Sequence, residues 1–211
     1  MGLNYKYKAS KEASFDVYAD DFDENGKPDI VLGYYQEGIQ FPVRGKQCSA
    51  EQIPETKERF SSYNIFANAD LNQIYSPIKL QNSLHYKATE FAHIYIENLG
   101  HGSFSYRAMP LSTQVGTINA MEVFDFNNDG NLDPIMGGNL MNSEVETPRS
   151  DACFGWLLLG NGCGGFKHQD FETTGLYVPY ETRKVRVINP KTSPMVIFAR
   201  NNKPLSIYRF K

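Results

Sequence analysis

The sequence has no concentration of positive charge and no long apolar run. Its 21 Lys and Arg residues stand against 24 Asp and Glu residues, and the basic residues form no block along the chain. Proteins that bind nucleic acid concentrate positive charge on one face, so we expect no nucleic-acid partner. No segment approaches the roughly 20 apolar residues of a membrane-spanning helix, so we expect no membrane span either.

Cysteine is scarce, which argues against a zinc site and against a disulfide-built fold. The chain has three cysteines, Cys48, Cys153 and Cys163, and their spacing matches no zinc signature. Cys153 and Cys163 are placed so that they can pair across a hairpin, which would leave one thiol over. Three unpaired thiols are the favoured interpretation.

Catalytic motifs are also missing. The histidines form no H-E-x-x-H or H-x-H pattern, and no G-x-S-x-G is present. The glycine-rich run at residues 160–165 leads into a strand-like segment, which is typical of a hairpin turn and not of a phosphate-binding loop. We therefore predict that the protein is not an enzyme, with a polysaccharide lyase or hydrolase as the alternative. His93, Phe154 and Trp156 are expected in the core, although the last two would also suit a platform for sugars.

What the sequence does contain favours an all-β fold. Hydrophobic residues make up 41% of the 211 residues and aromatic residues 13%, which is enough to bury a sizeable core in one domain. The 17 glycines and 11 prolines are spread between short apolar runs. Short apolar runs separated by turn residues are typical of strands joined by tight turns.

Two nine-residue segments share one pattern. Residues 125–133 read D-F-N-N-D-G-N-L-D and residues 21–29 read D-F-D-E-N-G-K-P-D, with oxygen-bearing side chains at positions 1, 3, 5 and 9 and glycine at position 6. A hard cation such as Ca²⁺ takes about six to eight oxygen ligands, and glycine permits the sharp reversal without a Cβ clash. With the backbone carbonyl of position 7 added, the predicted ligands of two calcium ions are Asp21, Asp23, Asn25, Lys27, Asp29, Asp125, Asn127, Asp129, Asn131 and Asp133.

The EF-hand begins with the same pattern but is rejected here. It requires a bidentate Glu at position 12, where this chain has Leu32 in one copy and Met136 in the other. Both segments are also flanked by strand-like sequence rather than by helices. An Asx-rich turn without metal is the remaining alternative. Two copies, each with several carboxylates in one loop, favour the cation, because like charges packed together require neutralisation.

The loops resemble those of the FG-GAP/VCBS repeat family, whose β-propeller blades carry D-x-[DN]-x-[DN]-G-x-x-D calcium loops, as integrin α-subunit blades do. Residues 95–104 (Y-I-E-N-L-G-H-G-S-F) and 159–166 (L-G-N-G-C-G-G-F) resemble the N-x-G-x-G-x-F hairpin of that family. The resemblance covers most of the chain and is to the C-terminal propeller region of bacterial FG-GAP proteins with an ASPIC/UnbV module. It implies propeller blades.

The N-terminal half is predicted to form a first blade with a helical insertion. An edge strand is expected at residues 3–8, and the metal repeat follows with strands at 15–20 and 29–35, which residues 38–43 continue. Residues 44–90 break the β pattern and carry apolar residues at helical spacing, with Asp70 as a helix cap. Two interpretations of this insertion stay open, a binding element or a packing lid. Strands at 91–98 and 103–107 are expected to complete the blade.

The C-terminal half is predicted to hold a second blade and a degenerate third. Expected strands of the second blade lie at 118–125, 133–138, 154–160 and 165–169, with a long surface loop at 138–151. Its charged residues, Glu144, Glu146, Arg149 and Asp151, could suggest a catalytic group, but a salt-bridged loop is the favoured interpretation. Expected strands of the third lie at 183–188, 195–199 and 205–210. Residues 189–194 stand where a third metal loop would be and lack its carboxylates, so no metal is expected there.

The predicted fold is therefore all-β, a single segment over residues 1–211 of about three four-stranded blades with a helical insertion at about 44–90. Known propellers close with about four to eight blades, so either a longer parent protein supplies further blades or two copies assemble. Met1-Gly2 begins directly before strand-like sequence with no apolar signal segment. This favours a fragment of a protein that is extracellular, periplasmic or on the cell surface.

The expected function is a calcium-stabilised module for extracellular adhesion or for binding a protein or glycan ligand, in which the calcium is structural. Weak calcium sites suffice outside the cell because calcium is plentiful there. Oxygen-only ligands argue against zinc and copper. The alternatives are a polysaccharide-active propeller enzyme and a scaffold without a ligand of its own within a multidomain surface protein.

Overall fold

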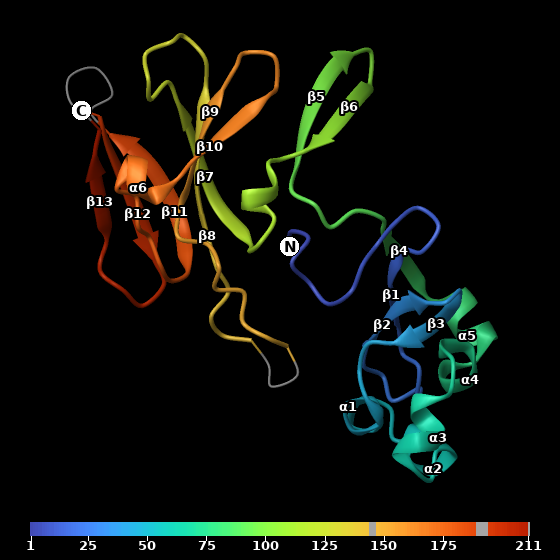
Figure 1. The fold of residues 1–211 in the computed structure, drawn as a ribbon. Coiled ribbons are helices and arrows are strands. Elements are labelled where there is room, and N and C mark those ends of the chain that lie inside the picture. Colours follow the sequence, from blue (N-terminus) through green and yellow to red (C-terminus); the bar gives the residue numbers. More distant parts are fainter. Residues whose placement is uncertain (144–146, 189–193, 211) are drawn as a thin grey trace. The chain divides into compact units, whose positions relative to one another are not determined.

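The structure, a computed structural model, describes residues 1–143, 147–188 and 194–210 (Figure 1). Within these residues, thirteen strands form four antiparallel sheets, joined by six short α-helices and one 3-10 helix. The strand-rich class predicted from the sequence is thus confirmed. The chain divides into two compact units, Lys6–Phe91 on the one hand and Met1–Tyr5 with Ala92–Lys211 on the other. Each unit is described by itself.

The unit Lys6–Phe91 contains a four-stranded sheet in the order β3-β2-β1-β4. Its strands are β1 (Phe15–Asp20), β2 (Asp29–Gln36), β3 (Ile39–Pro42) and β4 (Leu84–Ala88). Alternate positions of the two central strands are buried, as a sheet with one covered face requires. Tyr18 and Val31 lie on the covered face and belong to the core of this unit.

Five short helices cover that face: α1 (Lys46–Gln52), α2 (Glu55–Arg59), α3 (Tyr63–Ala67), α4 (Leu71–Tyr75) and α5 (Pro77–Asn82). Leu71, Ile74 and Leu80 are almost fully buried in one cluster with Tyr18 and Val31. Asp70 caps α4, because its side chain accepts the N–H of Gln73 while the Gln73 side chain accepts the N–H of Asp70. The predicted helices and the Asp70 cap are confirmed over residues 46–82, and the contacts show that these helices pack on the sheet. The last part of the insertion predicted at about 44–90 contains a strand instead, β4.

The larger unit contains an antiparallel meander in the order β10-β9-β8-β7. Its strands are β7 (Ile118–Phe124), β8 (Asp133–Gly138), β9 (Trp156–Gly160) and β10 (Phe166–Gln169), which confirms the four strands predicted there. Every residue of β8 is buried, because both faces of this strand are covered. Ile135 packs in one core cluster with Val185 and Phe198, whereas Met136 packs on the opposite face with Trp156.

A three-stranded sheet, β11 (Thr182–Ile188), β12 (Met195–Arg200) and β13 (Ser206–Arg209), supplies the first of those clusters. It confirms the three strands predicted for the last repeat. A single turn of helix, α6 (Phe171–Thr174), precedes it. The segment predicted to lack metal lies at residues 189–194, of which 189–193 are outside the described residues, as are Glu144 and Glu146.

The hairpin of β5 (Ile94–Gly100) and β6 (Ser103–Ala108) forms a two-stranded sheet of its own (Figure 1). The prediction that these strands complete the first blade is therefore wrong in this structure. β4 is the fourth strand of that sheet instead and pairs with β1. The sequence does not predict β4, because its five residues include the polar His85 and Lys87 and come directly after α5. Its pairing depends on contacts with β1, since the His85 ring stacks on Tyr18 at 4.2 Å.

The edge strand predicted at residues 3–8 is also wrong. The segment forms bends without strand pairing, although its apolar and polar residues alternate. Asn4 bonds through its backbone N–H to Gln114 at 3.0 Å, whereas the Tyr7 ring packs on Tyr34 at 4.6 Å. These two residues belong to different units. The alternating residues of this segment therefore make separate contacts and do not pair as one strand.

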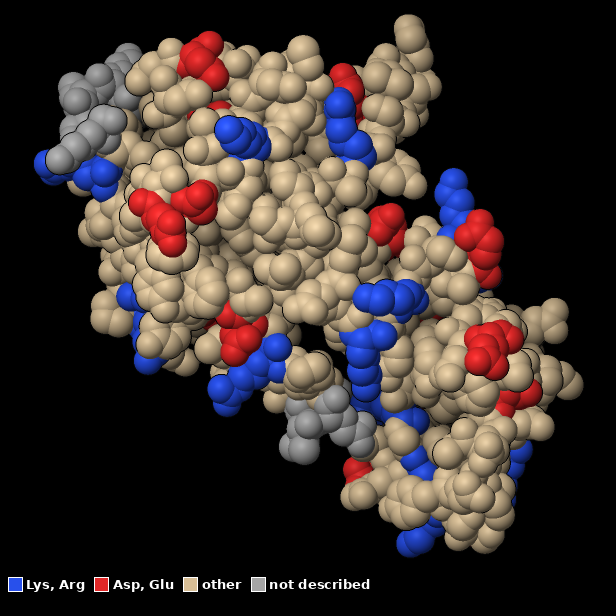
Figure 2. Space-filling view, in the orientation of Figure 1, with Lys and Arg blue, Asp and Glu red and all other residues tan. Residues whose placement is uncertain are grey.

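Charged residues are interspersed over both units. On the face shown in Figure 2, Lys and Arg lie among Asp and Glu and do not gather in one block. Within residues 1–143, 147–188 and 194–210, no helix is long and apolar enough to cross a membrane.

Candidate metal centre

The first nine-residue loop joins β1 to β2, and its side-chain oxygens accept the backbone N–H groups of the loop itself. The Asp21 carboxylate accepts from Asn25 at 2.9 Å and from Gly26 at 2.7 Å. Asn25 accepts in turn from Lys27 at 2.9 Å, and Asp23 accepts from Asn25 at 3.3 Å. These bonds turn the side chains of alternate residues toward the inside of the loop.

The second loop joins β7 to β8 and repeats this pattern position by position. The Asp125 carboxylate accepts from Asp129 at 3.1 Å and from Gly130 at 2.9 Å. Asp129 accepts from Asn131 at 2.8 Å, and Asn127 accepts from Asp129 at 3.1 Å. The two loops therefore have the same hydrogen-bonded shape, although positions 3 and 5 exchange Asp for Asn between them.

Backbone conformation also matches between the loops. Position 4 has positive φ in both, 60° at Glu24 and 59° at Asn128, and so does position 6, 82° at Gly26 and 86° at Gly130. Nothing lies within 4 Å of a Cβ built at either glycine. Glycine is therefore required there for its positive φ and not for space.

Position 9 anchors each loop to its strand. Asp29 and Asp133 are buried, with 4% and 0% of their surfaces exposed, and each accepts the N–H of the phenylalanine at position 2, at 3.0 Å and 2.9 Å. Burial raises the pKa of Asp29, and the nearby charges of Asp23 and Asp21 raise it further. A buried carboxylate next to two others is stabilised in its charged form by a cation.

The first loop places three carboxylates around one point. Ligand oxygens of Asp21, Asp23 and Asp29 all lie within 4.8 Å of one another. In the second loop, the Asn127 amide donates to Asp129 at 2.8 Å. The backbone N–H of Asn131 and this amide lower the pKa of Asp129, which keeps its carboxylate charged. Each carboxylate has further lone pairs beyond those that accept N–H groups, so both loops offer oxygen ligands of the kind that Ca²⁺ takes.

The structure thus places each predicted side-chain ligand in one of two matching loops and brings the acidic groups of the first together. The carbonyl role predicted for Lys27 and Asn131 stays a prediction, as does the ion itself. The strands that flank both loops agree with the rejection of the EF-hand, since that motif requires flanking helices.

The glycine-rich turn between β9 and β10 packs on the second loop. Asp133 accepts the N–H of Gly160 at 2.7 Å. A Cβ at Gly162 would lie 2.4 Å from the Asn131 amide oxygen, and one at Gly160 would lie 2.3 Å from the Leu132 carbonyl oxygen. The two sequence motifs that carry the family resemblance are therefore in direct contact here.

At the first loop, helices pack where the glycine-rich turn packs on the second loop. Lys79 of α5 donates to the Phe22 carbonyl at 2.5 Å, and its ammonium lies 4.0 Å from the Glu24 carboxylate. Phe22 is buried against Tyr75 of α4, with ring centroids 5.8 Å apart. Gln52 of α1 donates to the Ile30 carbonyl at 3.3 Å, just beyond the loop. The helical insertion therefore braces the first loop.

A polar network that the sequence analysis did not predict surrounds Asp16 of β1. This carboxylate is fully buried and accepts from Ser14 at 3.0 Å and Gln40 at 2.9 Å, and it lies 2.6 Å from His85 Nε2. An Asp between the apolar neighbours Phe15 and Val17 is the only sign of it in the sequence. Three partners satisfy the buried charge, as such a group requires.

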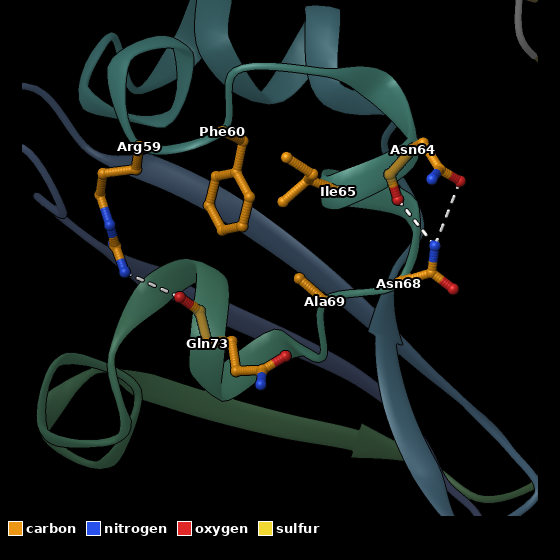
Figure 3. Close-up of a pocket in the computed structure, with 7 residues that line it drawn as sticks. All are labelled: Arg59, Phe60, Asn64, Ile65, Asn68, Ala69 and Gln73. Atoms are coloured by element: carbon orange, nitrogen blue, oxygen red, sulfur yellow. Dashed lines mark hydrogen bonds between the residues drawn. The ribbon is translucent and has the colours of Figure 1, made fainter.

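A hollow of about 600 Å³ opens between α2, α3 and α4 (Figure 3). Arg59 at its edge donates to the carbonyls of Gln73 and Ile74, both at 2.8 Å, and thereby caps the end of α4. Asn68 donates to the Asn64 carbonyl at 2.7 Å. Arg59 thereby joins α2 to α4, whereas Asn68 closes the end of α3. A binding role of the insertion stays a prediction.

The core predictions for individual aromatic residues and cysteines have mixed outcomes. Trp156 is buried as predicted, but Phe154 is wrong as a core residue because 44% of its surface is exposed, where it stacks on Tyr177. Cys153 and Cys163 do not form a disulfide with each other, in line with the favoured interpretation. Burial raises the pKa of the Cys153 thiol to about 11, whereas Cys163 is exposed in the glycine-rich turn.

In comparisons with known proteins, no family model, no curated protein and no solved structure matches this chain.

Proposed function

We propose that this chain is a calcium-binding module of the β-propeller type that binds a protein or glycan ligand outside the cell and is not an enzyme. The observation that carries the proposal is the repetition of one hydrogen-bonded loop, with inward-facing carboxylates, between two pairs of antiparallel strands. Chance turns would not be expected to share positive φ at the same two positions and a buried Asp at the ninth.

Calcium fits these loops better than other common ions. Zinc and copper prefer nitrogen and sulfur ligands, whereas the loops offer carboxylate, amide and carbonyl oxygens. Magnesium keeps several waters and binds through one or two carboxylates, fewer than the three that converge at Asp21, Asp23 and Asp29. The calcium is structural in this proposal, because it neutralises the carboxylates and ties together the ends of two strands.

The propeller part of the proposal draws on the sheets and on the resemblance to FG-GAP/VCBS repeats. A four-stranded antiparallel meander, as formed by β7–β10, is the unit of a propeller blade. The three-stranded sheet β11–β13 packs beside it through a shared core. In this proposal, the remaining blades come from a longer parent protein or from a second copy.

A thermal melt in EDTA, in 10 mM Ca²⁺ and in 10 mM Mg²⁺ tests the metal. With dissociation constants of about 10⁻⁴–10⁻³ M, calcium at this concentration adds about 1–3 kcal/mol per site, or roughly 3–10 °C in the midpoint. Asp125→Asn is expected to lose part of that gain. Glu58→Gln, which also removes one exposed carboxylate but lies on α2, is the matched control and is expected to keep it. Equal melting midpoints in EDTA and in calcium would mean that the two loops are Asx-rich turns that bind no calcium.

A further inference from the structure

A groove of about 730 Å³ lies between the β5–β6 hairpin and the meander β7–β10, within one unit of the chain. Its walls carry Ile94, Ile96, Met109, Met121 and Val123, and no charged residue is among the described residues that line it. Its size is within the range of about 300–1,000 Å³ that is typical of ligand sites. The groove is therefore large enough, and apolar enough, to receive a ligand.

One wall of the groove is the edge of a strand. Three consecutive residues of β5, Ile94, Tyr95 and Ile96, line it. Successive side chains of a strand point to opposite faces, so three lining residues in a row indicate that the strand presents its edge to the groove. β6 pairs along the other edge, and no further strand pairs with β5 in the described part of the chain. An open edge carries N–H and C=O groups that another strand can bond.

The opposite wall is apolar and exposed. Met121 and Val123 of β7 are 53% and 42% exposed, and Leu132 of the second nine-residue loop is 65% exposed. Met121 and Val123 lie at alternate positions of β7, as they would to receive the side chains of a strand alongside. Exposed apolar surface gathered at one place in this way marks an interaction site.

The base of the groove is well packed. The Tyr95 ring meets Phe166 edge-on at 5.4 Å, and Arg107, paired with Glu97 at 3.1 Å, lies over the same tyrosine ring. A Cβ at Gly164 would lie 2.7 Å from the Tyr95 ring, so a glycine is needed for this close approach. The hairpin is held at its base while the free edge of β5 stays open.

We propose that this groove binds an extended segment of a partner protein, with uncharged apolar side chains at alternate positions, as an added strand on β5. A sugar would require more free polar side chains than the groove offers, because the Asn161 side-chain oxygen already accepts two backbone N–H groups. An acyl chain would leave the backbone groups of the β5 edge without partners. A peptide strand satisfies both the ladder and the apolar wall.

The inference deepens the proposed function, on which it rests for the existence of a protein ligand. It names the site and the chemistry of that ligand. It also ties ligand binding to the second loop, whose residues Gly130, Asn131 and Leu132 form part of the wall.

The test uses the whole chain in 10 mM Ca²⁺ and a set of synthetic heptapeptides, Thr-X-Thr-X-Thr-X-Thr with X as Val, Leu or Phe. Binding is measured by calorimetry and by hydrogen exchange of the β5 amides. We expect at least one peptide to bind and to slow exchange in β5. The same peptide with alternate N-methylated residues, which cannot extend a ladder, is expected to bind at least about tenfold more weakly.

Substitutions of two residues in the walls of the groove, with one control, test whether the peptide binds there. Ile96→Asp and Met121→Asp put a charge into the groove and are expected to weaken binding at least about tenfold, since an unpaired charge resists desolvation. Ile207→Asp is the matched control, because Ile207 is 58% exposed, close to the 57% of Ile96, but lies on β13 and does not line the groove. It is expected to leave binding unchanged.

Several outcomes would overturn the proposal. They are the failure of every peptide to bind, equal binding of the N-methylated form, or an equal effect of Ile207→Asp. A dimer in sedimentation that Ile96→Asp disrupts would assign the groove to a second copy of the chain instead. If calcium raises the melting midpoint while no peptide binds, this inference fails alone. If peptides bind without any calcium effect, the metal part of the proposed function fails alone.

Discussion

Asp16 shows what a single buried charge requires in this fold. Its carboxylate has no exposed surface and is held by Ser14, Gln40 and His85. Replacing it with Ala would leave these polar groups without their partner, and each buried unsatisfied group costs about 1–3 kcal/mol. We expect Asp16→Ala to lower the free energy of unfolding of Lys6–Phe91 by about 2–5 kcal/mol.

Urea denaturation followed by far-UV circular dichroism measures this loss. Glu58→Gln on α2, an exposed carboxylate in the same unit, is the control and is expected to change stability by less than about 0.5 kcal/mol. A loss for Asp16→Ala no larger than that of the control would mean that the network contributes nothing.

His93 makes the stability of the protein depend on pH, and the direction of this dependence follows from its environment. Burial lowers the pKa of its imidazole, and Nε2 lies 2.8 Å from the Gly116 carbonyl oxygen, where a neutral ring donates. The unfolded chain therefore takes up a proton at higher pH than the folded one. Stability is full above the unfolded pKa of about 6.5 and is lost as pH falls through the lower folded pKa.

We expect the free energy of unfolding to fall between pH 7.5 and pH 5, by about 1.4 kcal/mol for each unit of difference between the two pKa values. His93→Gln, which cannot take up a proton in this range, is expected to flatten the profile. Burial also lowers the pKa of His168. His168→Gln is therefore the comparison variant, and it is expected to remove only the part of the pH dependence that comes from His168. A profile unchanged by His93→Gln would show that this ring titrates as in the unfolded chain.

At the scale of the element, a glycine decides how closely the β5–β6 hairpin and the β9–β10 turn approach. Gly164 has φ of 72°, and a Cβ there would lie 2.4 Å from Arg107 Nη2 as well as 2.7 Å from the Tyr95 ring. Gly175 has a similar φ of 67° but open space around it. Substitutions at the two glycines therefore distinguish the free-energy cost of an unfavourable backbone conformation from the free-energy cost of a steric clash.

We expect Gly175→Ala to cost about 1 kcal/mol and Gly164→Ala to cost about 1–3 kcal/mol more, because side chains or backbone must shift. Denaturant unfolding gives both values, and near-UV circular dichroism reports the environment of Tyr95. Equal costs for the two variants would show that Arg107 and Tyr95 move away freely.

The elements differ in how far the sequence predicts them, for physical reasons. β8 is predicted at its observed bounds because its apolar run begins directly after the loop at Asp133. Both metal-type loops are predicted because their hydrogen bonds are local and depend on spacing alone. β4 is not predicted, because its place depends on the contact of His85 with Asp16 and Tyr18, far apart in sequence. Phe154 is misplaced because apolar character does not reveal that its partner is an exposed ring, Tyr177.

At the scale of the whole molecule, each unit contains one nine-residue loop. The first is braced by α4 and α5 through Phe22 and Lys79. If calcium occupies both loops, it should stabilise the helices only through the first. We expect calcium to slow hydrogen exchange in residues 71–82 of the wild type and of Asp125→Asn, but not of Asp21→Asn.

Hydrogen exchange measured by mass spectrometry, with and without calcium, reports on both units in one experiment. In β8, the pattern should reverse, so that Asp125→Asn loses the protection and Asp21→Asn keeps it. Loss of protection in both regions from either single variant would show that the units respond as one body.

The carboxylates and amides of each loop accept hydrogen bonds from the backbone of the same loop, and these bonds give the loop its shape. An arriving ion would then find its ligands already oriented, and little conformational entropy would be lost at the moment of capture. Departure of such an ion would leave the turn in place, because these hydrogen bonds lie within the loop itself. A newly made chain could therefore complete its fold where calcium is rare and become more rigid on reaching a place where calcium is plentiful, without any change of topology.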